Sequence, residues 1–247
     1  NQILLENIKN SISEVVPKKK IGIAFSGGVD STLVSKICTD MGFDLVLLTI
    51  GFSESHDIVF SKEVNEFLNY SHHVLEIDPE TFPKITTDIH KVIDTDNLSW
   101  NENCIAFHYV SKLAKSLNLD VVITGNGIDE LFCGYNAYRE AFAGGQTKIN
   151  EVMDLKLENE LKMMKAVNVI ASEFDVKILQ PLLSEKFIKY AKTIPISEKI
   201  LSSDDLFRKH IIRKLANNIG VPELSCNKRK KALQYGSKIH KSLLKIK

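Results

Sequence analysis

The chain has 247 residues, enough to bury a core in one large domain or in a main domain with an appendage. Hydrophobic residues make up 44% of it and charged residues 26%, with 32 basic side chains against 31 acidic ones, which is the composition of an ordinary soluble protein. Because the charges nearly balance, the chain as a whole has no strong positive potential that would attract nucleic acid. No apolar run approaches the roughly 18 residues that a membrane span needs.

The chain begins with an amphipathic pattern, NQILLENIKNSISEVV, whose acidic residues are unlike a signal peptide. We therefore expect a cytoplasmic protein without a membrane partner, and the even charge balance argues against nucleic acid as a partner. The cysteines are far apart and form no CxxC pair, which argues against a zinc site or a disulfide framework. We expect all of them to be small buried side chains: Cys38, Cys104, Cys133 and Cys226.

Apolar runs bounded by turn residues predict β-strands in the first half of the chain. Because the runs are apolar almost throughout, they suit strands that are covered on both faces. They are residues 21–25, 45–52, 72–77 and 121–126. Helical patterns lie between them, at 31–42 and 104–118. This alternation predicts an α/β fold with a doubly wound, mostly parallel sheet, which binds ligands at the carboxyl ends of its strands.

From about residue 146 the pattern changes to helix. No strand of comparable strength interrupts the helical patterns at 147–174, 183–194 and 203–220. The Gly144-Gly145 pair is a natural turn before the first of them. We therefore predict an α/β nucleotide-binding domain at 1–145 and a helical C-terminal subdomain at 146–247 that completes the active site.

The sequence SGGVDST, at 26–32, stands where the first predicted strand gives way to a helix. Gly27 and Gly28 let the backbone approach a ligand closely, and the free amide groups at the start of the next helix favour an anion. The loop has neither the lysine of a Walker loop nor GxGxxG spacing. A carboxylate beside a bound phosphate needs a bridging cation such as Mg²⁺, so Asp30 is the first metal-ligand candidate.

Segments spread along the chain together resemble one known family. They are SGGVDST at 26–32, LLTIGF at 47–52, TGNGIDELFCGYNAY at 124–138 and the tail at 206–237. The first is similar to the loop of the PP-loop ATP pyrophosphatase superfamily. The third narrows the resemblance to the synthetase domain of asparagine synthetases and of the β-lactam and carbapenam synthetases. The resemblance implies that ATP and Mg²⁺ activate a carboxylate by adenylation, with release of pyrophosphate, before a nitrogen nucleophile attacks.

The resemblance also implies an ATP-binding set and a metal site. The ATP-binding residues would be Ser26, Gly27, Gly28, Asp30 and Ser31 in the loop, Leu48, Ile50 and Gly51 beside the adenine, and Thr124 and Gly125 near the end of the last predicted strand. Asp30 and Asp129 match the magnesium-binding aspartates of the family. Two carboxylates at two strand ends could hold a metal that neutralises charge on the departing pyrophosphate.

Two lysines of the tail match catalytic positions of the family. Lys209 falls where the family has a phosphate-binding lysine in a helix, and Lys230 where it has a lysine that stabilises the charged transition state. The run KRKK at 228–231 is also typical of a solvated basic face, and it leaves the register open. Lys231 is therefore the second candidate for the transition-state role.

Asn126 departs from the family pattern. Asparagine synthetases have a glutamate in a GEG sequence where this chain reads GNG, and an amide can hydrogen-bond but cannot act as a general base near neutral pH. Asn126 stays among the catalytic candidates, and asparagine formation by the family's route is open. Another carboxylate substrate, a nucleophile that needs less help, or a base from elsewhere would each account for the change. Tyr135 and Tyr138 nearby are expected as packed rings.

The sequence given shows no counterpart of the glutaminase domain that the full synthetases carry, and three explanations stay open: the chain is a piece of a longer protein, it uses free ammonia, or it receives ammonia from a separate glutaminase. The expected partners are a small carboxylate, ammonia that is free or delivered by a separate glutaminase subunit, and a second copy of the chain in a homodimer. Two other hypotheses stay open. In one, a PP-loop sulfur transferase thiolates transfer RNA with Cys133 as the sulfur carrier. In the other, a non-catalytic nucleotide-binding protein has kept the loop and lost the chemistry.

Overall fold

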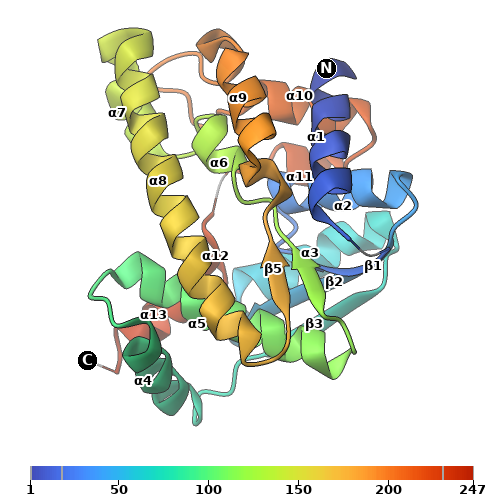
Figure 1. The fold of residues 1–247 in the computed structure, drawn as a ribbon, viewed down its shortest axis with the longest axis vertical. Coiled ribbons are helices and arrows are strands. Elements are labelled where there is room, and N and C mark those ends of the chain that lie inside the picture. The colour runs from blue at the N-terminus through green and yellow to red at the C-terminus, as the bar shows by residue number, and fades with distance from the viewer. Residues whose placement is uncertain (1, 18, 230, 247) are drawn as a thin grey trace.

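The computed structural model describes residues 2–17, 19–229 and 231–246. Its centre is a five-stranded sheet in the order β3-β2-β1-β4-β5, and every neighbouring pair is parallel (Figure 1). The strands are β1 Lys20–Ala24, β2 Asp44–Gly51, β3 His72–Glu76, β4 Val121–Ile123 and β5 Lys177–Leu179. This topology confirms the predicted doubly wound α/β class. The strand order reverses between β1 and β4, and such sheets bind ligands at that point of their carboxyl edge.

The second half of the chain is not helical throughout, because β5 pairs with β4, Val121 opposite Lys177 and Ile123 opposite Leu179. The prediction that this half adds no strand is therefore wrong. A three-residue strand followed by the polar Gln180 has too short an apolar run to be recognised from periodicity. The boundary near residue 145 stays a prediction, and the segment beyond it contributes helices together with one edge strand of the sheet.

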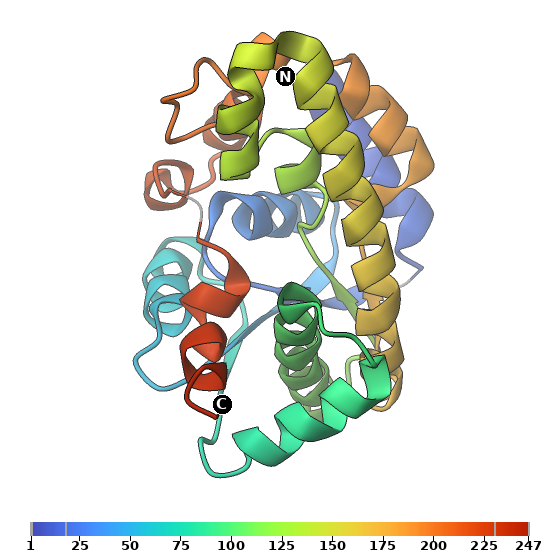
Figure 2. The same ribbon diagram turned by 90° about the vertical axis from the view of Figure 1, so that its left-hand side faces the viewer.

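Helices pack against the sheet and frame its carboxyl edge. Their bounds are α1 Gln2–Val15, α2 Val29–Asp40, α3 His56–Leu68, α4 Phe82–Ile93, α5 Leu98–Ser116, α6 Ile128–Leu131, α7 Asn136–Ala141, α8 Gly145–Ser172, α9 Glu185–Thr193, α10 His210–Asn218, α11 Glu223–Cys226, α12 Leu233–Gly236 and α13 Ile239–Leu243. The long α8 packs against α5 and β5, as it runs down the length of the molecule (Figure 1). Figure 2 shows the C-terminal helices in red, where α12 contacts both α3 and α5.

The helix predicted at 203–220 begins only at residue 210, as α10. The Asp205 carboxylate accepts hydrogen bonds from three backbone N–H groups between residues 201 and 208, at 2.9 to 3.0 Å. These bonds fold the segment into a turn, after which Arg208 and Lys209 have positive φ angles of 48° and 53°. Lys209 therefore lies in the loop before α10, and the prediction that it lies within a helix is wrong.

The hydrophobic core is continuous from the sheet to the helices that pack on it. Ile23, Leu47 and Val122, from three adjacent strands, are fully buried, as the apolar runs of the sequence predict. Over residues 2–17, 19–229 and 231–246, no helix is both long enough and apolar enough to cross a membrane.

Candidate active site

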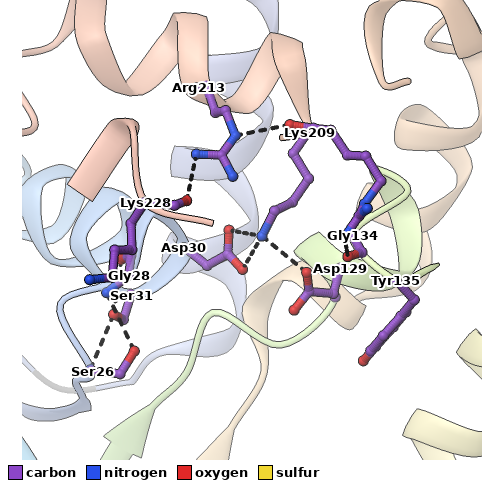
Figure 3. A network of polar contacts seen from close by, with 12 residues as sticks. Ser26, Gly28, Asp30, Ser31, Asp129, Gly134, Tyr135, Lys209, Arg213 and Lys228 are labelled. Carbon is purple, nitrogen blue, oxygen red and sulfur yellow. Dashed lines mark hydrogen bonds and ion pairs between the residues drawn. The ribbon is translucent and has the colours of Figure 1, made fainter. Parts of the chain in front are cut away.

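The turn between β1 and α2 is held by its own polar groups, of which Figure 3 shows Ser26, Gly28 and Ser31, and by a contact from α11. The hydroxyls of Ser31 and Thr32 donate to the Gly28 carbonyl at 3.2 and 2.9 Å, and the Ser225 hydroxyl donates to the Gly27 carbonyl at 2.7 Å. Gly27 has a φ of 77°, and a Cβ there would approach the backbone of α3 to 3.2 Å, so the position requires glycine. The loop therefore holds the amino end of α2 in position for an anion.

The ammonium group of Lys209 lies between two carboxylates at the centre of the site (Figure 3). Its Nζ donates to both carboxylate oxygens of Asp30, at 2.8 and 2.7 Å, and to Oδ1 of Asp129 at 3.0 Å. Burial of Lys209 alone would lower its pKa, but the charges of Asp129 and Asp30 outweigh burial and raise the pKa above the usual 10.5. The lysine is therefore charged at neutral pH and joins the loop after β1 to the segment after β4.

Asp30 and Asp129 are the predicted magnesium ligands, and they meet at one lysine. In nucleotide enzymes Mg²⁺ binds one or two carboxylates together with substrate phosphates and water, so this donor set fits the metal. Within the described part of the chain, no group of three or more His, Cys, Asp or Glu could hold a metal without a ligand's help. Gly134 is required beside the pair, because a Cβ there would lie 1.8 Å from Oδ1 of Asp129.

A small cavity of about 70 Å³ adjoins the loop after β1 and has a basic wall. The cations that line it are Lys209, Arg213, Lys228, Arg229 and Lys231. The Arg213 guanidinium donates to the carbonyl of Lys228 at 3.0 Å and to that of Arg208 at 2.9 Å, which ties the basic segment to α10 (Figure 3). Cations gathered at the amino end of a helix suit a pyrophosphate group.

The predicted transition-state lysine, Lys230, lies outside the described residues. Lys231, the second candidate, lines both the small cavity and the larger one beside it. Ser26, Ser31 and the two aspartates also line both, so the cavities share one wall. The choice between Lys230 and Lys231 stays a prediction.

A larger cavity of about 260 Å³ opens between the carboxyl edge of the sheet, α5 and α8. Leu48 and Ile50 line it, together with apolar side chains of α5, which suits an adenine ring as predicted from the sequence. Thr124 and Gly125 line it as well. Gly51 instead packs against Ser55 and Ser237, so its predicted place beside the adenine is not a direct lining position of this cavity.

The polar part of the larger cavity surrounds Asn126 and contains two buried carboxylates. Nδ2 of Asn126 donates to Oε1 of Glu160 at 2.5 Å, and Glu160, from α8, is only 4% exposed. The Glu130 carboxylate accepts from a backbone N–H at 2.9 Å and from the Tyr135 hydroxyl. Tyr135 thus lines the cavity rather than serving only as a packed ring, whereas Tyr138 is fully buried as expected.

Comparison with known proteins decides the family. The family model described as asparagine synthase matches residues 4–173, more than half of the chain. The chain belongs to the asparagine synthase family. It is 26% identical over 274 aligned positions to the putative glutamine-hydrolyzing asparagine synthetase 1 of Methanocaldococcus jannaschii, covering 97% of this chain and 50% of that protein. It is 25% identical over 214 positions to the asparagine synthetase of Asparagus officinalis, covering 82% and 36%.

The chain therefore spans half or less of the length of these asparagine synthetases. Among solved structures, the NMN synthetase of Francisella tularensis has a TM-score of 0.49 and 18% identity, over 95% of this chain and 75% of that one. The range matched to the asparagine synthase family ends before α10 and so leaves out Lys209. Lys209 nevertheless lies in the candidate site, because its ammonium group contacts Asp30 and Asp129, which are both within the matched range.

Sequence interpretation missed the residues that α8 contributes to this member of the asparagine synthase family. Lys156, Asn159, Glu160 and Met163 line the larger cavity at the spacing of one helical face. In sequence they belong to a charged helical run that is typical of a solvent-facing surface, so no local signal could have selected them.

Asp57, at the start of α3, is a second residue that sequence interpretation missed. It lines both cavities and is 2% exposed, and burial raises the pKa of its carboxyl against a smaller opposing effect of His56. Gly236 packs directly on it, since a Cβ at that position would lie 1.9 Å from Oδ1. Its place just after a strand's carboxyl end was the signal that could have identified it.

Cys133 is fully buried and lines neither of the two cavities. Burial raises the pKa of its thiol to about 12, so the thiolate that sulfur chemistry requires is not formed near neutral pH. This geometry argues against a sulfur carrier at this position. All the cysteines are buried and free, as predicted.

Asp205→Asn is expected to weaken folding in a pH-dependent way. Burial would raise the pKa of this carboxyl, but backbone N–H groups of Arg208 and Leu201 and the side chain of His210 lower it to about 2. Because the folded pKa lies below the unfolded value of 3.8, the stabilisation is complete above pH 3.8 and is lost as the pH falls toward 2. We expect a loss of about 1 kcal/mol at pH 7 after allowance for solvent screening.

Urea unfolding of the wild-type protein and of the variant, at pH 7 and at steps from pH 4 to 2, measures this effect. The difference between the two proteins should shrink over the lower range. The neighbouring Asp204→Asn is the matched control, because the Asp204 side chain is 97% exposed and its carboxylate lies 3.9 Å from the Arg139 guanidinium. Equal effects of the two substitutions would contradict the assigned role of Asp205 in folding the loop before α10.

Proposed function

We propose that this chain is an ATP-dependent synthetase that adenylates a carboxylate, releases pyrophosphate and joins ammonia to the activated carbonyl as an amide. Membership of the asparagine synthase family supports the use of ATP by a ligase-like enzyme. The observation that carries the proposal is the meeting of Lys209, Asp30 and Asp129 where the small basic cavity joins the larger one. Adenylation needs positive charge and metal-binding carboxylates at this junction, between phosphate and acid.

Each of the two cavities would bind a different part of the substrates. The small basic cavity would take the β- and γ-phosphates, the apolar part of the larger cavity the adenine, and its polar part, around Asn126, the carboxylate substrate. The α-phosphate would then lie at the shared wall, near Lys209 and Lys231. Mg²⁺, when bound by Asp30 and Asp129 with phosphate oxygens, would neutralise charge on the departing pyrophosphate.

The proposed reaction has two steps. A carboxylate oxygen bonds to the α-phosphorus while the bond from that phosphorus to the pyrophosphate oxygen breaks. Ammonia then forms a bond from nitrogen to the acyl carbon, AMP leaves with the carboxylate oxygen, and the nitrogen gives up a proton. The Lys209 charge would favour both steps, because negative charge develops first on pyrophosphate and then on the acyl oxygen and AMP. The ammonia would arrive free or from a separate glutaminase subunit.

We expect the protein to form pyrophosphate and AMP in equal amounts from ATP, Mg²⁺ and ammonium when a suitable carboxylate is present. The assay compares aspartate, other amino acids and amino-free carboxylates, and it measures pyrophosphate, AMP and ADP separately. Chelation of the metal and omission of the carboxylate are the controls. Aspartate-dependent pyrophosphate would support asparagine formation despite Asn126, and dependence on another acid would support the general reaction with a different product.

Formation of ADP and phosphate would contradict the proposal. ATP binding without turnover for any carboxylate would favour the non-catalytic nucleotide-binding alternative. A binding titration with an ATP analogue whose α,β bridge is a methylene group separates that result from a protein that binds no nucleotide.

A further inference from the structure

We propose that the imidazole of His56, at the start of α3, donates a hydrogen bond through Nε2 to the diphosphate part of ATP. The inference rests on the proposed function, because that function puts the β- and γ-phosphates in the small basic cavity. His56 lies outside the sequence segments that resemble the synthetase family, so the resemblance gives it no role. The ligand group is a diphosphate, bound as part of ATP before the reaction and as free pyrophosphate after it.

The first turn of α3 forms part of the wall of the small basic cavity. His56, Asp57 and Phe60 line the cavity from this turn. Asp57 also lines the larger cavity, whereas His56 does not. A ligand atom that meets His56 would therefore belong to the group in the small cavity rather than to the adenine or to the acid.

Two contacts fix the orientation of the His56 ring. Its Nδ1 lies 3.2 Å from Oδ1 of Asp57, and the ring stacks on Phe60 with the centroids 5.3 Å apart and the planes 28° apart. Phe60 in turn packs on the loop after β1, because a Cβ at Gly27 would lie 3.0 Å from its ring. The His56 ring is thus held beside the loop that suits an anion.

The other ring nitrogen, Nε2, is buried and has no hydrogen-bond partner among the described residues. Within the same part of the chain, Oδ2 of Asp57 also has none, and only 3% of the Asp57 side chain is exposed. Buried polar atoms of folded proteins are nearly always hydrogen-bonded, so unpartnered atoms of two residues that line a cavity indicate a ligand. Because Nδ1 contacts Asp57, Nε2 is the nitrogen that is left for that ligand.

The charges around the small cavity favour an anion. In the described part of the chain, five Lys or Arg side chains and three Asp side chains line it. One of these cations, Lys228, lies close to His56, since its Nζ is 4.1 Å from the centroid of the Phe60 ring on which His56 stacks. Phosphate oxygens accept hydrogen bonds, and such bonds are strengthened by the phosphate charge, so the group required from His56 is an N–H.

The His56–Asp57 pair can present this N–H without repelling the phosphate. Either a protonated Asp57 donates to Nδ1 and the proton of the neutral ring lies on Nε2, or the ring carries both protons beside an ionised carboxylate. Burial raises the pKa of the Asp57 carboxyl, against opposing effects of His56 and Lys231, and this favours a proton within the pair. In both forms the pair has no net charge.

Binding titrations of two variants test this inference without relying on turnover. Inorganic pyrophosphate, the α,β-methylene ATP analogue and AMP are each titrated in the presence of Mg²⁺. His56→Asn keeps an amide near the place of Nδ1 and has no atom at that of Nε2, so it should weaken pyrophosphate and the analogue by about 10- to 100-fold. It should weaken AMP by about threefold or less. His56→Gln reaches the place of Nε2, so it should weaken all three ligands by about threefold or less.

The order of the two variants distinguishes a ligand contact from a structural role. If His56 served only to satisfy Asp57, His56→Asn would bind like the wild type and His56→Gln would bind weakly, which would overturn the inference. His73→Asn is the matched control, because His73 is an exposed residue of β3 that lines neither cavity. Melting temperatures without ligand report folding. If His56→Asn does not fold, His56→Phe replaces it, since it keeps a ring on Phe60 and lacks both nitrogens.

The outcomes separate this inference from the proposed function. Equal weakening of AMP and pyrophosphate by His56→Asn, or no weakening of either, overturns the inference and leaves the synthetase proposal standing. Selective weakening of pyrophosphate, in a protein that forms no pyrophosphate from ATP with any carboxylate, supports His56 as a diphosphate ligand and contradicts the synthetase. A wild-type protein that binds neither pyrophosphate nor the analogue overturns the inference.

Discussion

Replacing Lys209 by methionine is expected to lower the rate of pyrophosphate release by about 100-fold or more, the effect of removing one preorganised charge from a transition state. Methionine keeps much of the side-chain volume and removes only the ammonium group. That group contacts both Asp30 and Asp129 and lines the basic cavity, so the charge would be lost at the junction of the two cavities. Steady-state release of pyrophosphate, with the substrate found for the wild-type protein, measures the change.

The same substitution should lower the melting temperature of the protein without ligand. Removing one partner of a buried ion pair leaves the other charge uncompensated and typically costs about 3 to 5 kcal/mol. Asp30 and Asp129 are partly exposed, at 22% and 17% of their side chains, so the cost should fall at or below the lower end of that range. Added Mg²⁺ should raise the melting temperature of the variant more than that of the wild type, because it restores positive charge.

Lys189→Met on α9 is the matched control, because Lys189 is 74% exposed and pairs with Glu185 on the surface. It should leave both the rate and the melting temperature nearly unchanged, since surface ion pairs contribute little. Full pyrophosphate release by Lys209→Met would show that the lysine only joins two loops, and the phosphate-binding role would have to move to Arg213 or to the basic segment at 228–231.

Local patterns made part of this site predictable. The glycines and hydroxyls of residues 26–32 stand between a β-branched run and an amphipathic run, so their place at a strand's carboxyl end follows from short-range sequence. The same holds for Asp129, which follows β4 within a few residues. These residues meet because parallel strands end at one edge of the sheet, which is a property of the fold class and needs no knowledge of side-chain contacts.

Contacts across long stretches of chain were not predictable in this way. Glu160 meets Asn126 across 34 residues of sequence, and its helical neighbours look like any solvated face. Lys209 was identified through a family resemblance, but its backbone conformation was not, because the turn before α10 depends on the cap that Asp205 forms. Tertiary contacts overrode a local helical pattern there. The strand β5 forms because it pairs with β4, and its three residues alone do not encode a strand.

Asp30→Asn is expected to remove the magnesium dependence of nucleotide binding and to reduce pyrophosphate release by about 100-fold or more, since metal stabilisation of the transition state is worth several kcal/mol. The substitution keeps the shape of the side chain but removes a charge that an Mg²⁺ ligand requires. Titrations of ATP with excess Mg²⁺ and with chelator measure the first effect. The wild-type protein should bind more tightly with the metal, and Asp30→Asn should bind equally with and without it.

Two further variants test whether the effect of Asp30→Asn comes from the loss of a metal ligand. Asp40→Asn, at the end of the same helix, is the matched control, because Asp40 pairs only with Lys36 at the surface among the contacts described, and it should behave as wild type. Asp129→Asn should share the loss of magnesium dependence, because both carboxylates would hold one ion. If Asp30→Asn lost turnover but kept the magnesium dependence, Asp30 would serve as the counter-charge of Lys209 rather than as a ligand. Asp129 and the phosphates would then bind the metal, since Mg²⁺ in such sites can be held by a single carboxylate together with substrate phosphates.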